Sequence, residues 1–160
     1  MLHRFLEDGR QGVPQFESEA RKCGAKLIEA EHMLLALASD SESHAGRLLM
    51  ESGLDHERLA SALRDEHRRS LAFAGFQAPD EPQTNAAKVD GLLSLGTSAK
   101  VALVRALIAS RSHHARRARL KDVDVLRGIL LAELGTVPRA LAIAGVDRMT
   151  LISRTGAGDS

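Results

Sequence analysis

The 160-residue sequence contains few aromatic side chains and almost no cysteine. Its aromatic residues are four phenylalanines, with no tryptophan or tyrosine, which argues against a protein that stacks the bases of single-stranded nucleic acid on aromatic rings. The single cysteine, Cys23, excludes an internal disulfide and a cysteine-based zinc site, and we expect it to fill an apolar helix position. One cysteine also fits a reducing cytoplasm.

Long apolar runs and nucleotide-binding loops are missing as well. No run of about 18 apolar residues occurs, and the first residues lack the apolar stretch of a signal peptide, so we expect a cytoplasmic protein without a membrane span. No G-x-x-x-x-G-K-[ST] motif is present, which argues against nucleotide hydrolysis by a P-loop. The histidines, the serines and Cys23 form no pattern typical of a metal site or a nucleophile. We therefore expect no metal, no cofactor and no catalysis.

The net charge of +1 hides an uneven distribution. Residues 1–70 hold 13 acidic and 10 basic side chains, whereas residues 97–160 hold 11 basic and 5 acidic ones. This asymmetry favours docking of an acidic half against a basic half. The most basic stretch is 111–121, which could contact nucleic-acid phosphates, be a solvated loop, or dock to an acidic protein. The sequence pI of about 8.0 is lower than nucleic-acid-binding domains usually have.

Apolar residues recur at intervals of three and four through an Ala- and Leu-rich sequence, and no alternating strand pattern occurs, which predicts an all-α fold. Gly53 and Gly145 are expected to end helices, and Asp55 and Asp147 to cap the helices that follow. The segment rich in proline and acidic residues before Gly91 reads as a linker, and Leu71, Phe73 and Phe76 are expected to pack back on the body.

The sequence also contains an internal repeat. A shift of 92 positions aligns residues 31–59 with 123–151 without a gap, so that core leucines, the stop glycines and the capping aspartates coincide. Two Leu-rich helical pairs could match by chance, but the ungapped register favours a duplication. We predict two four-helix repeats related by a pseudo-twofold axis, over 1–70 and 95–154, with a linker over 71–94 and a disordered tail over 155–160.

These motifs resemble the N-terminal domain of the Clp unfoldases, especially the ClpC type. The sequence IEAEHMLLAL at 28–37 matches the family's E-H-L-L-L-G-L signature, SGLD at 52–55 matches the turn that follows, and LGTSAKVALVRAL at 95–107 matches the opening helix of the second repeat. The resemblance covers about 2–154. Gly9, Gly12 and Pro14 fall within the family's first helix, which predicts that this helix is kinked or starts again near Pro14. No ATPase modules follow, so we expect a stand-alone domain.

The resemblance implies a ligand site. In ClpC-type domains the glutamate of each E-H signature lies in a pocket that accepts phosphorylated arginine, and this role carries over to Glu31, with His32 beside it. Val123 stands at the equivalent place in the second repeat, so at most one such pocket is expected. Alternatively, Glu31 favours the helix dipole and His32 is a packing or capping histidine. A peptide groove is expected between the first helices of the two repeats, lined by Leu2, Phe5, Val13, Leu95 and Leu103.

The resemblance therefore implies a non-catalytic binding module. Such a module would recognise degrons, peptides or Clp partners, and would modulate Clp-dependent proteolysis as an adaptor, as a decoy, or by sequestering cyclic peptides that target Clp. The alternative is a nucleic-acid-binding regulator that uses the basic stretch 111–121. Salt-sensitive binding to generic duplex would favour the alternative.

Overall fold

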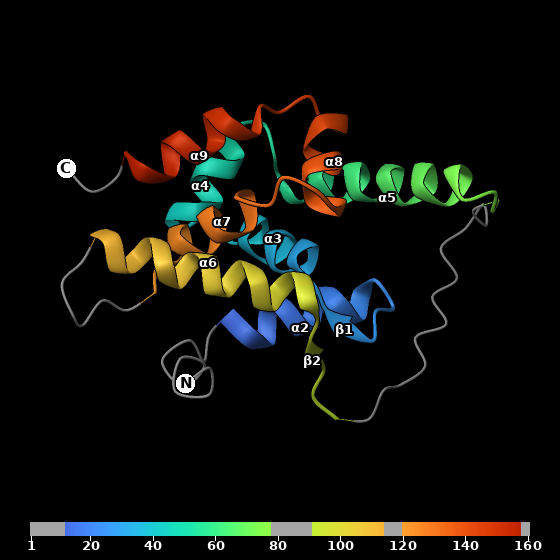
Figure 1. Ribbon diagram of the computed structural model, residues 1–160, viewed down its shortest axis with the longest axis horizontal. Helices are drawn as coiled ribbons and strands as arrows, with labels where there is room; N and C mark the ends of the chain where they lie inside the picture. Colours follow the sequence, from blue (N-terminus) through green and yellow to red (C-terminus); the bar gives the residue numbers. More distant parts are fainter. Residues whose placement is uncertain (1–11, 78–90, 114–119, 158–160) are drawn as a thin grey trace.

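The computed structural model describes residues 12–77, 91–113 and 120–157, which form eight helices and two very short strands (Figure 1). In chain order the elements are α2 (Gly12–Lys22), β1 (Leu27–Ile28), α3 (Ala30–Ser39), α4 (His44–Glu51), α5 (His56–Phe73), β2 (Ser94–Leu95), α6 (Thr97–His113), α7 (Asp122–Leu130), α8 (Thr136–Ile143) and α9 (Arg148–Gly156). The prediction of an all-α fold is confirmed.

The helices form two four-helix repeats, α2–α5 and α6–α9, related by a pseudo-twofold axis as the sequence predicts. Helices α7, α8 and α9 begin 92 positions after α3, α4 and α5, which is the offset of the sequence repeat. The two strands were not predicted. They pair in parallel, with Leu27 opposite Ser94 and Ile28 opposite Leu95, and so join the repeats beside the start of α3 and α6.

The predicted helix ends are formed by the expected residues. Gly53 and Gly145 follow the last residues of α4 and α8 with φ of 76° and 72°, a left-handed conformation that suits glycine. Asp55 and Asp147 then accept the backbone N–H three residues later, at 2.8 and 2.9 Å, and so cap α5 and α9. Pro14 lies in the first turn of α2, where its missing N–H costs no helical hydrogen bond. The segment before Gly12, needed to tell a kinked helix from one that starts again, lies outside the described residues.

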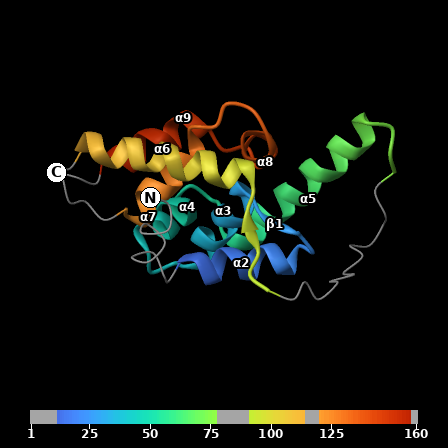
Figure 2. The same cartoon turned by 60° about the horizontal axis from the view of Figure 1, so that its bottom comes forward.

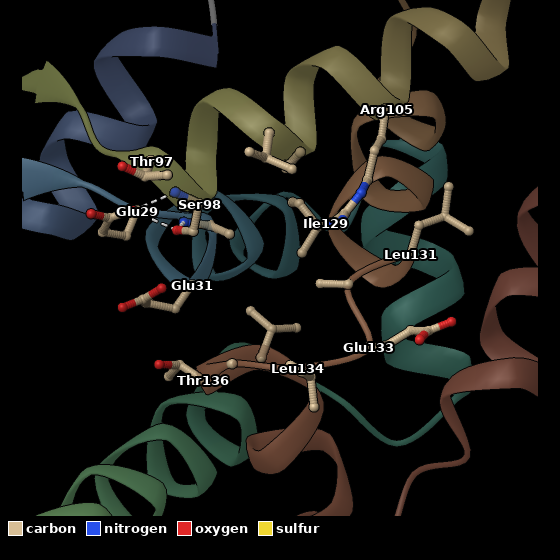
Figure 3. A pocket seen from close by; sticks show the side chains of 16 residues that line it. Glu29, Glu31, Thr97, Ser98, Arg105, Ile129, Leu131, Glu133, Leu134 and Thr136 are labelled. Atoms are coloured by element: carbon tan, nitrogen blue, oxygen red, sulfur yellow. Dashed lines mark hydrogen bonds between the residues drawn. The ribbon is translucent and has the colours of Figure 1, made fainter.

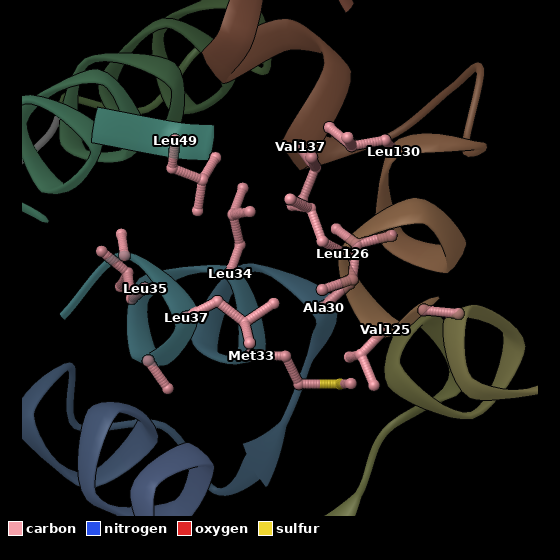
Figure 4. Close-up of a cluster of buried hydrophobic side chains, with 14 of the residues drawn as sticks. Ala30, Met33, Leu34, Leu35, Leu37, Leu49, Val125, Leu126, Leu130 and Val137 are labelled. Atoms are coloured by element: carbon pink, nitrogen blue, oxygen red, sulfur yellow. The ribbon is translucent and has the colours of Figure 1, made fainter. Parts of the chain in front are cut away.

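The core is built around α3, which contacts α2, α4, α5, α6, α7 and α8. Eight of its ten residues are buried, so this helix is enclosed on almost every side. Figure 4 shows Met33 of α3 pointing toward Val125 of α7, and Leu34 pointing into the space between Leu49 of α4 and Val137 of α8. The buried side chains of α3 and α7 belong to one cluster, so the two halves share one hydrophobic core.

Small residues allow α6 and α7 to approach closely. A Cβ atom at Gly128 would lie 2.2 Å from the carbonyl oxygen of Ala102 and 2.9 Å from the Cβ of Ala106. Only glycine fits there without moving one of the two helices.

Arginines join the repeats at several points. The Nε atom of Arg139 lies 2.6 Å from the buried carboxylate of Glu66. Arg58 of α5 donates to the carbonyl oxygen of Ala144 at the end of α8, at 2.9 Å. Arg154 of α9 donates to the hydroxyl of Ser52 at the end of α4, at 2.8 Å. Cations at helix C-termini also interact favourably with the helix dipole.

Three local expectations need correction. Helix α5 continues to Phe73, and its last turns project from the body (Figure 2), so Phe73 and Phe76 are 97% and 65% exposed instead of packing back. Thr155 and Gly156, expected in the tail, belong to α9, and the Thr155 hydroxyl is buried against the carbonyl of Ile152. At the other end of the expected linker, Leu93 is buried and Ser94 belongs to β2. Residues 78–90 of that linker and 158–160 of the tail lie outside the described residues.

Candidate functional site

The N-termini of α3 and α6 meet at the joint between the repeats. The backbone N–H of Ser98 donates to a carboxylate oxygen of Glu29 at 3.0 Å, and the Ser98 hydroxyl donates to the same oxygen. The backbone N–H of Ala30 in turn donates to that hydroxyl, at 2.9 Å. One N–H group at each helix start is thus satisfied by a side chain from the other repeat.

Gly96 makes this joint possible. A Cβ atom at this position would lie 1.9 Å from the carboxylate of Glu29. The backbone N–H of Gly96 also donates to the carbonyl oxygen of Ile28 at 2.8 Å, continuing the β1–β2 pairing. The carboxylate of Glu29 therefore lies directly over the start of α6.

His32 caps α3 from within. It is 5% exposed, and its Nδ1 atom accepts the backbone N–H of Glu29 at 2.9 Å. Burial lowers the pKa of His32, although the negative charges of Glu29 and Glu19 act to raise it. A lowered pKa agrees with a neutral ring that accepts a hydrogen bond at Nδ1. Asp124 makes the equivalent contact in the second repeat, accepting the backbone N–H of Lys121 at 2.9 Å. This geometry favours the capping alternative for His32 over contact with a ligand.

Beside this joint lies a cavity of about 870 Å³, which we call the Glu31 pocket (Figure 3). Three segments line it: the start of α3, one face of α6, and the stretch from the end of α7 to the start of α8. Half of its 16 lining residues have apolar side chains. The lining residues with apolar side chains are Ala30, Val101, Ala102, Ile129, Leu131, Ala132, Leu134 and Val137.

Glu31 is the half-buried carboxylate of this pocket. Burial raises its pKa above the ordinary value, its own backbone hydrogen bond opposes this shift, and the nearby charges of Glu29 and Glu66 add to it. The other charged groups of the lining are Glu29, Glu133 and Arg105. The pocket is therefore lined by three carboxylates and one guanidinium, and it is acidic overall.

Val123, the repeat equivalent of Glu31, is 8% exposed and belongs to the hydrophobic core. It offers no carboxylate, so the described part of the second repeat does not reproduce the Glu31 site.

Of the five residues expected in the peptide groove, the structure describes Val13, Leu95 and Leu103. Leu2 and Phe5 lie outside the described residues. Leu103 is 5% exposed and sits in the core, and Leu95 packs against the core from β2. Val13 is half-buried on α2, a helix that contributes no residue to the Glu31 pocket. A groove between α2 and α6 thus has little exposed surface from Leu103, because that side chain faces inward.

The structure adds pocket residues that the sequence did not indicate. Leu134 is 90% exposed, and together with Glu133 and Thr136 it forms the wall contributed by the α7–α8 connection. Arg105 approaches from α6 (Figure 3). In the sequence, this wall is marked only by a leucine that precedes Gly135. That pattern is too weak to identify a pocket.

Other candidate features were also located. Within the described part of the chain no group of three His, Cys, Asp or Glu could hold a metal ion. Cys23 lies just beyond α2 and is exposed, so the expectation that it fills an apolar helix position is wrong. The side chains of residues 111–119, which make up most of the basic stretch, lie outside the described residues. None of the helices described has both the length and the hydropathy that a membrane crossing requires.

Comparison with known proteins gives a match to one fold. No family model matches the sequence. Among solved structures, the chain is similar to the crystal structure of the N-terminal domain of the caseinolytic protease associated chaperone ClpD from Arabidopsis thaliana. The TM-score is 0.66, the match covers 97% of this chain and 96% of that one, and 19% of the aligned residues are identical. The chain thus has the fold of a Clp N-terminal domain.

Proposed function

We propose that this chain is a non-catalytic binding module of the Clp N-terminal type that recognises degrons, peptides or Clp partners in the cytoplasm. By doing so it modulates Clp-dependent proteolysis, as an adaptor, as a decoy, or by sequestering cyclic peptides that target Clp. Within the Clp N-terminal fold, we assign the chain to the ClpC type because its sequence contains the E-H signature with Glu31.

The Glu31 pocket is the observation that carries this proposal. It combines a half-buried carboxylate with apolar walls, which is the composition of a site for a side chain with an apolar stem and a cationic end. A guanidinium can pair with a carboxylate through two parallel hydrogen bonds. The sequence resemblance implies an arginine-derived ligand at the same residue.

The test is a degradation assay with a purified ClpC-type unfoldase, its peptidase, ATP and an unfolded substrate. Adding an excess of this chain should change the degradation rate, upward for an adaptor and downward for a decoy. The Glu31→Gln variant should lose most of this effect, whereas Glu57→Gln, an exposed change outside the pocket, should retain it. A rate unaffected by the wild-type chain would contradict the proposal, as would equal effects of wild type and Glu31→Gln.

A further inference from the structure

The charges around the Glu31 pocket restrict what it can hold. Glu29 and Glu31 lie at one end of the pocket (Figure 3). Arg105, the single cation among the described residues of the lining, enters from α6 on the opposite side. A phosphoryl group carries about −1.5 to −2 charge at pH 7. A ligand that places this charge beside Glu31 would bring it next to two carboxylates.

Helix starts normally attract phosphoryl groups, because their first N–H groups point outward without partners. Here two of those donors, the N–H groups of Ser98 and Ala30, are already used. Glu29 accepts from both the N–H and the hydroxyl of Ser98, and the Ser98 hydroxyl accepts the N–H of Ala30. A carboxylate of this chain thus occupies the place at the start of α6 where a phosphoryl oxygen would otherwise be bound.

A guanidinium without a phosphoryl group fits the same surroundings. No lysine or arginine of the described residues forms an ion pair with Glu31, although burial disfavours its charge. An incoming cation would stabilise that charge in a partly desolvated site, and the apolar wall formed by Val101, Leu131 and Leu134 would cover the methylene stem of an arginine. Arginine suits the site better than lysine, because its planar guanidinium can form two parallel hydrogen bonds to a carboxylate.

We propose that the Glu31 pocket takes the unphosphorylated guanidinium of an arginine side chain in a bound peptide, and that Glu29 keeps a phosphoryl group out. This inference rests on the proposed function, whose pocket it uses, and it names the ligand class of that pocket. Glu29 acts as a specificity-determining residue, and Glu31 is the residue that contacts the ligand.

The experiment is an NMR titration of the ¹⁵N-labelled full chain with three forms of one short peptide, acetyl-Gly-Ala-X-Ala-Gly-amide. The central residue X is arginine, citrulline or phosphoarginine. Citrulline keeps the shape of arginine without its charge. The arginine peptide should shift the amide signals of Glu31, Ser98 and Thr136, while the citrulline and phosphoarginine peptides should bind at least about tenfold more weakly.

Two variants separate the roles of the carboxylates. Glu31→Gln should reduce binding of the arginine peptide to the level of the citrulline peptide. Glu29→Gln keeps an oxygen that can accept from Ser98 but removes one negative charge, so it should narrow the gap between the phosphoarginine and arginine peptides. Glu57→Gln makes the same change of net charge outside the pocket and should leave all three affinities as in wild type.

The outcomes distinguish this inference from the proposed function. If the phosphoarginine peptide binds wild type as tightly as the arginine peptide, or more tightly, the inference is overturned and the pocket remains a ligand site. Equal binding of the arginine and citrulline peptides would also overturn it, because charge would then play no part. If no peptide shifts any signal of the pocket, both the inference and the proposed ligand site fail, whereas the degradation assay still reports separately on an effect on Clp.

Discussion

The carboxylate of Glu31 lies beside apolar side chains of the pocket, where water solvates only part of it. Because burial raises its folded pKa above the unfolded value, the folded state holds the proton more tightly than the unfolded state does. The ionised side chain therefore lowers the stability of the fold at neutral pH, and this cost disappears as the pH falls below the ordinary glutamate pKa of about 4.5. Binding sites often retain such a cost because ligand binding needs the charge.

Replacing Glu31 by Gln should accordingly raise the free energy of unfolding at pH 7. At pH 4 the difference should shrink, because the wild-type side chain is then largely neutral as well. Urea titrations followed by far-UV circular dichroism at the two pH values measure this. The exposed Glu57→Gln change should stay within about 0.5 kcal/mol of wild type at both. A gain from Glu31→Gln that is as large at pH 4 as at pH 7 would contradict the argument.

The Glu66–Arg139 pair behaves in the opposite way. Burial alone would raise the pKa of Glu66, but hydrogen bonds from Ser70 and Arg139, together with the charge of Arg139, outweigh it and lower the pKa. The stability that ionised Glu66 contributes is therefore present above its unfolded pKa, and it is lost as the pH falls through the lower folded value.

Arg139→Ala should lower the free energy of unfolding at pH 7 by about 2 kcal/mol. Breaking a fully buried pair costs about 3–5 kcal/mol, and this arginine is 58% exposed, which reduces the loss. The difference from wild type should decrease in urea titrations below pH 4. The double variant Glu66→Gln, Arg139→Ala should recover part of the loss, because no unpaired carboxylate then remains buried. An unchanged or larger loss in the double variant would show that the arginine acts through packing alone.

At the scale of helices, the sequence located the C-terminal ends of α4 and α8 and the first residues of α5 and α9, because each depends on one local glycine or aspartate. Gly53 and Asp55 act within a few positions, so their effect can be derived without the fold. The Glu31 pocket could be predicted only in part. Glu31 came from the signature, but Arg105 and Leu134 come from segments that meet Glu31 only after folding. The projection of α5 was also missed, because linker composition does not show where neighbouring helices stop covering a helix.

The close contact of α6 and α7 predicts the sign of the change in stability when Gly128 is replaced by alanine. At an unconstrained helix position, Gly→Ala stabilises by about 1 kcal/mol. At Gly128 the added methyl would collide with the backbone of α6, so Gly128→Ala should instead lower the free energy of unfolding by about 1–3 kcal/mol. Thermal and urea unfolding of the variant measure this. A stabilised variant would mean that α6 and α7 do not pack at this distance.

At the scale of the whole molecule, the two repeats behave as one folding unit, because α3 of the first half is covered by helices of the second. We expect a single unfolding transition in which the calorimetric and van't Hoff enthalpies agree. A separately expressed fragment of residues 1–70 should show little helix by circular dichroism, since it would expose the core face of α3. Two resolved transitions, or a folded fragment, would contradict this expectation.

An arginine of each half contacts a helix end of the other half. Arg58 reaches the end of α8 at Ala144, and Arg154 reaches the end of α4 at Ser52, the position that corresponds to Ala144 across the repeat. The donors match less closely, because Arg154 corresponds to Ala62, one helical turn after Arg58. Reciprocal contacts between corresponding sites are what an isologous interface has when two identical subunits meet across a twofold axis. The two arginine contacts are reciprocal at their acceptors and shifted by one helical turn at their donors, so they approximate such an interface. This arrangement agrees with the duplication that the sequence repeat favours, in which a former contact between two subunits would now lie in the interior of a single domain.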